Sequence, residues 1–459
     1  MIKNQIKGRE IPAFILLFFF TFLFYGCKKE KVPEVYKPSN AHKAYIYSLQ
    51  ELNLAETALG KDWIDASIKA LNDPVEISPP FEEVFYIDPN DPDAYAYLFS
   101  VKRGQRIEVD ISFYSKDSLN LFIDLFREYG TSVEEWILVA SADKKNHRLE
   151  FEPRRDARYM VRLQPELLRG GQFSVIIRIV PSLDFPVEGR NNQSIQSFFD
   201  SPRYQDGQRV RHNGVDIFAR RHTPVLAPCD AYVQRVDTGE IAGNYIYLYD
   251  SKRYLYIYFA HLQTQDVKPN TRVNCGQVIG TIGNTGNAIT TPPHLHFGVY
   301  ASGTGAVDPY PFIAKTNTQP VNIFSSLDVM GQWVRLKQTA NLKSLSSNNP
   351  AEPVSLNKHS IMKVIGASAS VYRVVLPDGI SGYITANAIE SATEILEQQP
   401  VINTVALLEN PEENAVTREN IHPGKEYYIL GKYNGYWMVK TQEGNTGWMQ
   451  ILETNPTAI

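Results

Sequence analysis

Apolar and polar side chains alternate with a period of two from about Pro79 to Ile179, the pattern of strands with one buried face. Clear examples are the runs 95–99, 107–111 and 173–177. The chain contains 26 Tyr and 22 Phe against only 6 Met, a composition that leans toward β-structure. Its 459 residues are too many for one hydrophobic core, so we predict a mainly β, multidomain protein.

Residues 76–185 combine these alternating runs with turn residues at short intervals, which predicts a β-sandwich. The segments FSVKRGQRIEVDI, LEFEPRRDARYMVRL and GGQFSVIIRI resemble the jelly-roll-like pre-peptidase (PPC-type) modules that accompany secreted peptidases. These segments contain no catalytic motif. The resemblance therefore implies a structural or carbohydrate-facing role.

Before the sandwich, residues 40–75 carry apolar side chains at helical spacing. Gly60 interrupts this pattern, and Pro74 follows its last apolar position. We predict a small helical segment of two short helices, with a break at Gly60 and an end before Pro74.

The first 27 residues have the organisation of an export signal, because Lys3, Lys7 and Arg9 precede an apolar run over residues 11–25. That run is short for a bilayer-spanning helix, which needs about 20 residues. The small residue followed by Cys27 resembles a bacterial lipobox, and the resemblance implies a lipoprotein signal peptide whose removal leaves Cys27 lipidated. The alternative is an uncleaved N-terminal anchor with an incidental cysteine.

Under both interpretations the chain is exported and held at a bacterial membrane, so we expect it in the cell envelope. Residues 28–39 are rich in Lys and Pro and poor in apolar side chains, which predicts a flexible tether.

An internal repeat occupies the C-terminal part, where YRVVLPDGISGYI matches YWMVKTQEGNTGWM. The match places Tyr383 and Trp448 after equivalent glycines of a hairpin. The two units, residues 320–393 and 398–455, resemble bacterial SH3-like modules. The resemblance implies two small barrels that bind peptidoglycan, and the alternative is that these aromatic residues are simply core residues.

Charge and cysteine content limit the partners and the redox state. The formal net charge is −4 and no Lys/Arg block is dense, so nucleic acid is not an expected partner. Export would place the two remaining cysteines, Cys229 and Cys275, in an oxidising compartment, where a disulfide between them could persist. Free thiols that pack as small apolar residues are the alternative.

Five of the nine histidines fall between residues 212 and 296. The segment RHNGVDIFA places His212 four residues before Asp216, with Gly214 allowing a tight turn between them. The segment YFAHL ends a strongly apolar strand in His261, where a polar imidazole needs a partner.

In the segment PPHLHFGVY, His294 and His296 lie two apart on a predicted strand, so both imidazoles point to one face while Leu295 points to the core. Catalytic zinc sites use three protein ligands, drawn from imidazoles and carboxylates. One member of this pair completes such a set with His212 and Asp216. The remaining imidazoles can then hydrogen-bond a water molecule or a developing oxyanion.

The stretches RHNGVDI, TPVLAPCDAYV, YIYFAHL, VNCGQVIGTIGNTGN and HLHFGVY resemble zinc endopeptidases of the lysostaphin/LytM type. The resemblance implies an antiparallel β peptidase domain over residues 186–318. It also implies that His212, Asp216 and His296 bind Zn²⁺ while His261 and His294 assist catalysis.

Two positions depart from the pattern of that family. The family usually has a Gly-Pro step before the His-x-His pair, where this chain has TTPP with Pro292, and a Glu after the following Phe, where this chain has Gly298. Neither position is a ligand, so we expect activity to be retained and the rim of the groove to differ.

The function implied is hydrolysis of peptide cross-links in bacterial peptidoglycan by a zinc-dependent endopeptidase. The alternative is a non-catalytic envelope regulator, or a wall-anchoring protein, that activates other cell-wall hydrolases through a protein partner. Retention of all three ligands favours the enzyme.

Overall fold

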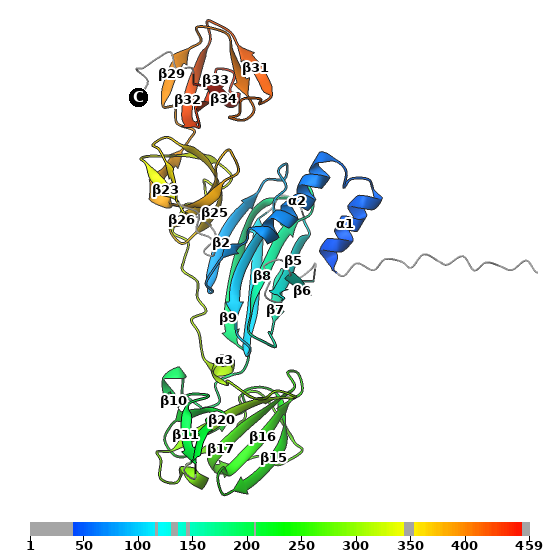
Figure 1. Cartoon of the computed structure of the whole chain (residues 1–459), viewed down its shortest axis with the longest axis vertical. Coiled ribbons are helices and arrows are strands. Elements are labelled where there is room, and N and C mark those ends of the chain that lie inside the picture. Colours follow the sequence, from blue (N-terminus) through cyan, green and yellow to red (C-terminus); the bar gives the residue numbers. More distant parts are fainter. Residues whose placement is uncertain are drawn as a thin grey trace, which may run out of the picture.

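The computed structural model describes residues 40–114, 118–129, 136–143, 147–205, 208–343 and 353–451. The predicted signal peptide, the tether and Cys27 lie outside the described residues. Strands predominate, which confirms the mainly β prediction. Figure 1 shows residues 195–313 at one end, the sandwich in the middle and residues 397–450 at the other end. None of the described helices is both long and apolar enough to cross a membrane.

Two helices, α1 (Ala41–Glu51) and α2 (Ala58–Asn72), precede the sheets. Each begins after a residue, Asn40 or Thr57, whose side chain accepts a hydrogen bond from a backbone N–H of the first turn. The second helix ends before Pro74, as predicted. The predicted break at Gly60 is wrong, because Gly60 lies in the first turn of α2. A Cβ there would lie 2.0 Å from the carbonyl oxygen of Leu54, so packing rather than helix breaking requires this glycine.

Two sheets form the sandwich (Figure 1). The first has the order β1 (Val75–Glu76), β3 (Tyr95–Val101), β8 (Ala157–Pro165), β5 (Leu121–Glu128) and β6 (Trp136–Ser141). The second contains β2 (Phe81–Ile87), β9 (Gly171–Pro181), β4 (Gln105–Tyr114) and β7 (Arg148–Phe151). Buried side chains such as Phe85, Leu125 and Phe173 fill the space between them, which is the apolar half of the alternating pattern.

The second sheet continues into the first C-terminal repeat. Strand β25 (Ile361–Ser368) pairs antiparallel with β2, so that Val84 lies opposite Ala367. Strands β26 (Val371–Val375) and β27 (Ser381–Thr385) extend the sheet further. The sandwich and the first repeat, predicted as separate domains, therefore share one sheet, although each keeps its own buried core.

A buried ion pair crosses the same junction. Glu83 is fully buried and accepts hydrogen bonds from Arg373 of β26 at 2.9 Å and from the hydroxyl of Tyr97 at 2.5 Å. The guanidinium also lies over the ring of Tyr95. Sandwich and repeat thus depend on each other for the neutralisation of a buried charge.

The two repeats contain equivalent hairpins. The first repeat has β22 (Trp333–Leu336), β23 (Ala340–Leu342), β24 (Val354–Leu356), β25, β26, β27 and β28 (Ile389–Ser391). The second has β29 (Glu397–Pro400), β30 (Val405–Leu408), β31 (Thr417–Ile421), β32 (Glu426–Tyr433), β33 (Tyr436–Thr441) and β34 (Thr446–Gln450). Val374 pairs with Gly382 in one hairpin as Val439 pairs with Gly447 in the other.

Within the described residues no sheet closes on itself, so both repeats are open sheets where closed barrels were expected. In the first repeat, part of β25 pairs with β2 of the sandwich, and β23 and β24 form a separate two-stranded sheet that a bridge from Lys343 to Tyr383 joins to β27. The likeness to SH3 modules therefore stays a prediction.

The histidine-rich segment folds into an antiparallel sheet. Its main order is β10 (Ile195–Ser197), β13 (Val215–Phe218), β20 (His294–Ala301), β17 (Leu255–Gln265), β16 (Gly243–Asp250), β15 (Ala231–Gly239) and β18 (Arg272–Val273). Strands β14 (Pro224–Leu226), β19 (Val278–Ile282) and β21 (Gly305–Val307), the hairpin of β11 (Pro202–Gln205) and β12 (Gln208–Arg211), and helix α3 (Tyr310–Ile313) complete this part. Leu248, Ile257 and Phe297 point from one face of the sheet into a buried core.

Candidate metal centre and active site

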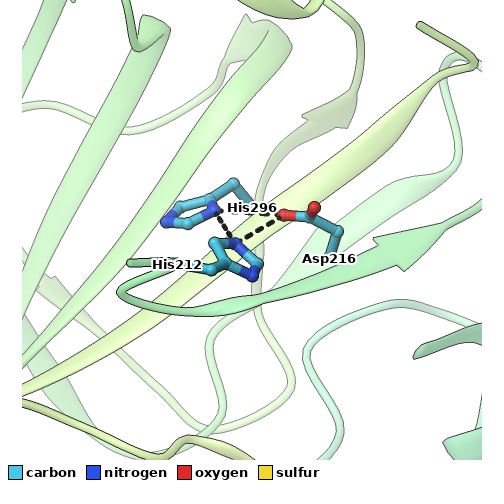
Figure 2. A group of neighbouring side chains, drawn as sticks. All are labelled: His212, Asp216 and His296. Atoms are coloured by element: carbon cyan, nitrogen blue, oxygen red, sulfur yellow. Dashed lines mark hydrogen bonds and ion pairs between the residues drawn. The ribbon is translucent and has the colours of Figure 1, made fainter. Parts of the chain in front are cut away.

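Figure 2 shows the side chains of His212, Asp216 and His296 converging on one point. Nε2 of His212 lies 3.0 Å from Nδ1 of His296 and 3.1 Å from Oδ1 of Asp216, and the last two atoms are 3.1 Å apart. Zinc bonds of about 2.0–2.1 Å in a tetrahedron separate ligand atoms by about 3.3 Å. These three atoms form a triangle, the metal triangle, which therefore has the size that a tetrahedral zinc ion requires.

Strand pairing builds this triangle. Strands β13 and β20 are antiparallel neighbours in which Asp216 stands directly opposite His296. His212 precedes β13 and reaches the same point across Gly214. A Cβ on Gly214 would lie 2.6 Å from the carbonyl oxygen of Phe297 and 2.8 Å from the His296 ring, so close approach, and not turn geometry alone, demands glycine there.

Hydrogen bonds orient the ligand atoms. Nδ1 of His212 lies 2.9 Å from the carbonyl oxygen of Phe198, so Nδ1–H donates and Nε2 keeps its lone pair toward the centre. Three acceptor atoms then face one another at close range, an arrangement that repels itself unless a cation or a proton lies between them. The donor set thus fits a divalent metal.

The protonation states agree with this fit. Burial raises the pKa of Asp216, but the adjacent imidazoles of His212 and His296 outweigh burial and hold that pKa well below its usual range. Burial lowers the pKa of His296, with Asp216 acting in the opposite direction. An ionised carboxylate and neutral imidazoles are the forms that bind a metal.

His261 and His294 lie beside the triangle, with ring centroids 5.1 Å apart. Nδ1 of His261 donates to the carbonyl oxygen of Thr285, and Nδ1 of His294 donates to that of Pro292, both at 2.9 Å. Each ring therefore keeps an unprotonated Nε2 when neutral. Burial, followed by His294 and His296, lowers the pKa of His261 to about 4, so this ring is neutral at pH 7.

His261 has an unusual backbone conformation as well, with φ of 63°. This left-handed conformation is uncommon for a residue other than glycine and occurs often at functional sites. It coincides with a register shift between β17 and β16, because His261 lies between the pairs Phe259–Ile246 and Leu262–Asn244.

Arg203 is a further residue of the centre that sequence reasoning missed. Its guanidinium contacts Oδ2 of Asp216, the oxygen that faces away from the triangle, and donates to the hydroxyl of Ser197 at 2.8 Å. These contacts hold the carboxylate so that Oδ1 points inward. Arg203 lies on β11, outside every motif used for prediction, so only the folded hairpin identifies it.

Cys229 and Cys275 are free thiols in the structure, the alternative to a disulfide. Cys229 is buried, and the exposed Cys275 lies with Sγ 3.1 Å from a carboxylate oxygen of Asp184. Burial, reinforced by Asp184, raises the pKa of the Cys275 thiol to about 11. Neither thiol contacts the metal centre.

The antiparallel sheet thus carries a His-Asp-His candidate metal centre with two further imidazoles beside it. Residues 210–309, called the M23 domain from here on, match the model of peptidase family M23.

Part of the chain is similar to proteins named as endopeptidases. The peptidoglycan DD-endopeptidase ShyC of Vibrio cholerae serotype O1 is 40% identical over 97 residues, which are 21% of this chain and 22% of that protein. The L-Ala–D-Glu endopeptidase of Bacillus subtilis is 34% identical over 139 residues, 28% of this chain and 42% of that protein. The chain thus spans less than half the length of either relative.

Part of the chain is also similar to a solved structure. The catalytic domain of lysostaphin from Staphylococcus simulans is 32% identical, with a TM-score of 0.23, and the match covers 26% of this chain and 88% of that one.

Proposed function

We propose that the M23 domain is a zinc-dependent endopeptidase that hydrolyses peptide cross-links of bacterial peptidoglycan. The observation that carries this proposal is the convergence of two imidazole nitrogens and one carboxylate oxygen within 3.0–3.1 Å of one another. The M23 match and the names of the peptidoglycan endopeptidases among the relatives support it.

His212, Asp216 and His296 would hold the ion, and zinc, when bound, supplies a Lewis acid that polarises the scissile carbonyl and activates water. The chain's own contribution is to hold protons at defined atoms. Nε2 of His261 and Nε2 of His294 are available to accept a proton from the attacking water and to return one to the leaving amine. Their anchoring carbonyls, from Thr285 and Pro292, fix both rings in the required orientation.

Digestion of purified sacculi tests the proposal, with the released fragments identified by mass spectrometry. We expect cleaved cross-links from the purified protein alone, their loss after chelation and their return with Zn²⁺. A non-catalytic regulator would release fragments only when a second cell-wall hydrolase is present. That outcome would replace the enzyme with the regulator.

We also propose that the protein is lipid-anchored in the cell envelope through Cys27. A diacylglycerol together with an acyl chain supplies the stable anchoring that one chain cannot. The variant Cys27→Ser should lose labelling by a fatty-acid analogue and leave the membrane fraction. Equal labelling of the two proteins would contradict the lipobox interpretation.

A further inference from the structure

A group of tyrosines covers the face of the M23 sheet that carries His296. This group, the tyrosine face, comprises Tyr245, Tyr247 and Tyr249 of β16, Tyr256 and Tyr258 of β17, and Tyr300 of β20. Strand register places them together, because Tyr258 is opposite Tyr247 and Gly298, and Tyr256 is opposite Tyr249 and Tyr300. Their sequence neighbours point to the opposite face and form the core.

The rings form two groups of contacts that strand register places side by side. Tyr247 and Tyr258 are stacked with centroids 4.5 Å apart, Tyr249 and Tyr256 lie 5.0 Å apart, and Tyr258 lies 6.2 Å from Tyr300. The surface begins at the metal centre, since the Tyr258 ring meets His296 edge-on at 5.8 Å. It extends across the sheet away from that centre.

The surface is partly open to solvent. Tyr256 is 37% exposed, and the other five are half-buried. On the adjoining strand, Tyr232 pairs with Tyr249 and is 38% exposed, so the aromatic character continues toward the edge of the sheet. Monomeric proteins rarely expose a contiguous patch of this kind without a binding role.

Gly298 lies in the middle of this surface, between His296 and Tyr300 along β20. A Cβ there would lie 3.0 Å from the Tyr300 ring and 3.5 Å from Cβ of Tyr258. The absence of a side chain at the buried Gly298 leaves room for the Tyr300 ring to lie close to the strand.

We propose that the tyrosine face binds pyranose rings of the glycan strand next to the peptide that the metal centre cleaves. A pyranose has a face of C–H groups that stacks on an aromatic ring and an edge of hydroxyls that bonds phenol oxygens, and tyrosine offers both surfaces. The proposal rests on the proposed function. It deepens that function by making the substrate peptidoglycan with its sugars attached.

Two substrates separate this proposal from simple peptide binding. One is a cross-linked muropeptide dimer that carries its disaccharides, and the other is the same peptide after removal of the sugars. For the double variant Tyr249→Ala/Tyr256→Ala, and for Gly298→Glu, the ratio of kcat/KM with sugars to kcat/KM without them should fall about tenfold, mainly through KM. Zinc content should not change, and the exposed sandwich variant Tyr114→Ala should keep the wild-type ratio. Equal losses on both substrates would assign the face to peptide and overturn the proposal.

A binding measurement tests glycan binding by the tyrosine face independently of hydrolysis. A tetramer of N-acetylglucosamine, titrated into the zinc-loaded full chain and followed by calorimetry, should bind the wild type and bind the double variant about tenfold more weakly. Absence of binding to the wild type would overturn the glycan proposal even if the peptidase activity holds. Binding without any hydrolysis of sacculi would retain the glycan site and reject the endopeptidase.

Discussion

His294 and His296 stand two residues apart on β20, yet their partners differ. His296 contacts His212 and Asp216, whereas His294 stacks on Phe218 and faces His261. We therefore expect His296→Ala to lose a metal ligand, so that zinc falls far below one per chain and activity vanishes. The variant His294→Ala should keep its zinc and lose about a hundredfold or more in rate.

Atomic emission for zinc, beside peptide release from sacculi, checks both variants. Loss of zinc from His294→Ala with retention by His296→Ala would reverse the ligand assignment. Full activity of both variants would place the site elsewhere.

His42 of α1 is a buried histidine whose environment makes folding sensitive to pH. It stacks on Trp63 and bonds Gln164 at 2.7 Å, and burial, followed by Arg162, lowers its pKa from 6.5 to about 4. The unfolded state therefore binds the proton more strongly, so stability decreases as pH falls from about 6.5 toward 4.

The expected contribution of His42 is a loss of about 2 kcal/mol between pH 7 and pH 5. Urea unfolding at the two pH values should show this loss in the wild type and a correspondingly smaller one in His42→Gln. The exposed control His222→Gln should behave as the wild type. Identical pH dependences of wild type and His42→Gln would contradict the prediction.

Strands β13 and β20 bring the ligands together only because the chain before β13 passes very close to the His296 ring. The substitution Gly214→Ala adds a Cβ that meets the Phe297 carbonyl, which cannot move without breaking the sheet, so the His296 ring must shift. We expect zinc affinity to fall about ten- to a hundredfold.

Competition with a chromophoric chelator measures this affinity. The matched control is Gly239→Ala on β15, where the new Cβ meets only the Tyr245 ring, at 3.7 Å. If Gly214→Ala bound zinc as tightly as this control, close packing would not be the reason for the glycine.

At the scale of the whole molecule, a shared sheet and a buried ion pair join the sandwich to the first repeat. Arg373→Met would leave Glu83 buried without its partner, which typically costs about 3–5 kcal/mol. We expect a loss of this size in urea unfolding, with zinc content unchanged because the metal centre lies in another sheet.

Two further variants serve as controls for this measurement of unfolding. Arg418→Met, which removes a half-exposed ion pair with Glu409, should cost at most about 1 kcal/mol. Glu83→Gln combined with Arg373→Met should recover part of the loss, because no buried charge remains. Equal effects of Arg373→Met and Arg418→Met would mean that the junction does not depend on the ion pair.

Local patterns were sufficient for the strands, whereas the choice of His296 over His294 as the third ligand came from the resemblance to the lysostaphin/LytM type. Alternation marks the buried half of each strand, and the two-residue spacing of His294 and His296 places both on one face while Leu295 enters the core. The C-terminal repeat likewise predicted two hairpins with equivalent glycines.

Local sequence patterns could not predict which distant segments pair with one another. The register that sets Asp216 opposite His296, the approach of Arg203, the tyrosine face around Gly298 and the union of β2 with β25 all join residues far apart in the chain. A strand's alternation states which face is buried but not which strand lies beside it. That choice depends on the total surface and charge buried when the whole chain packs, so it arises only in the tertiary structure.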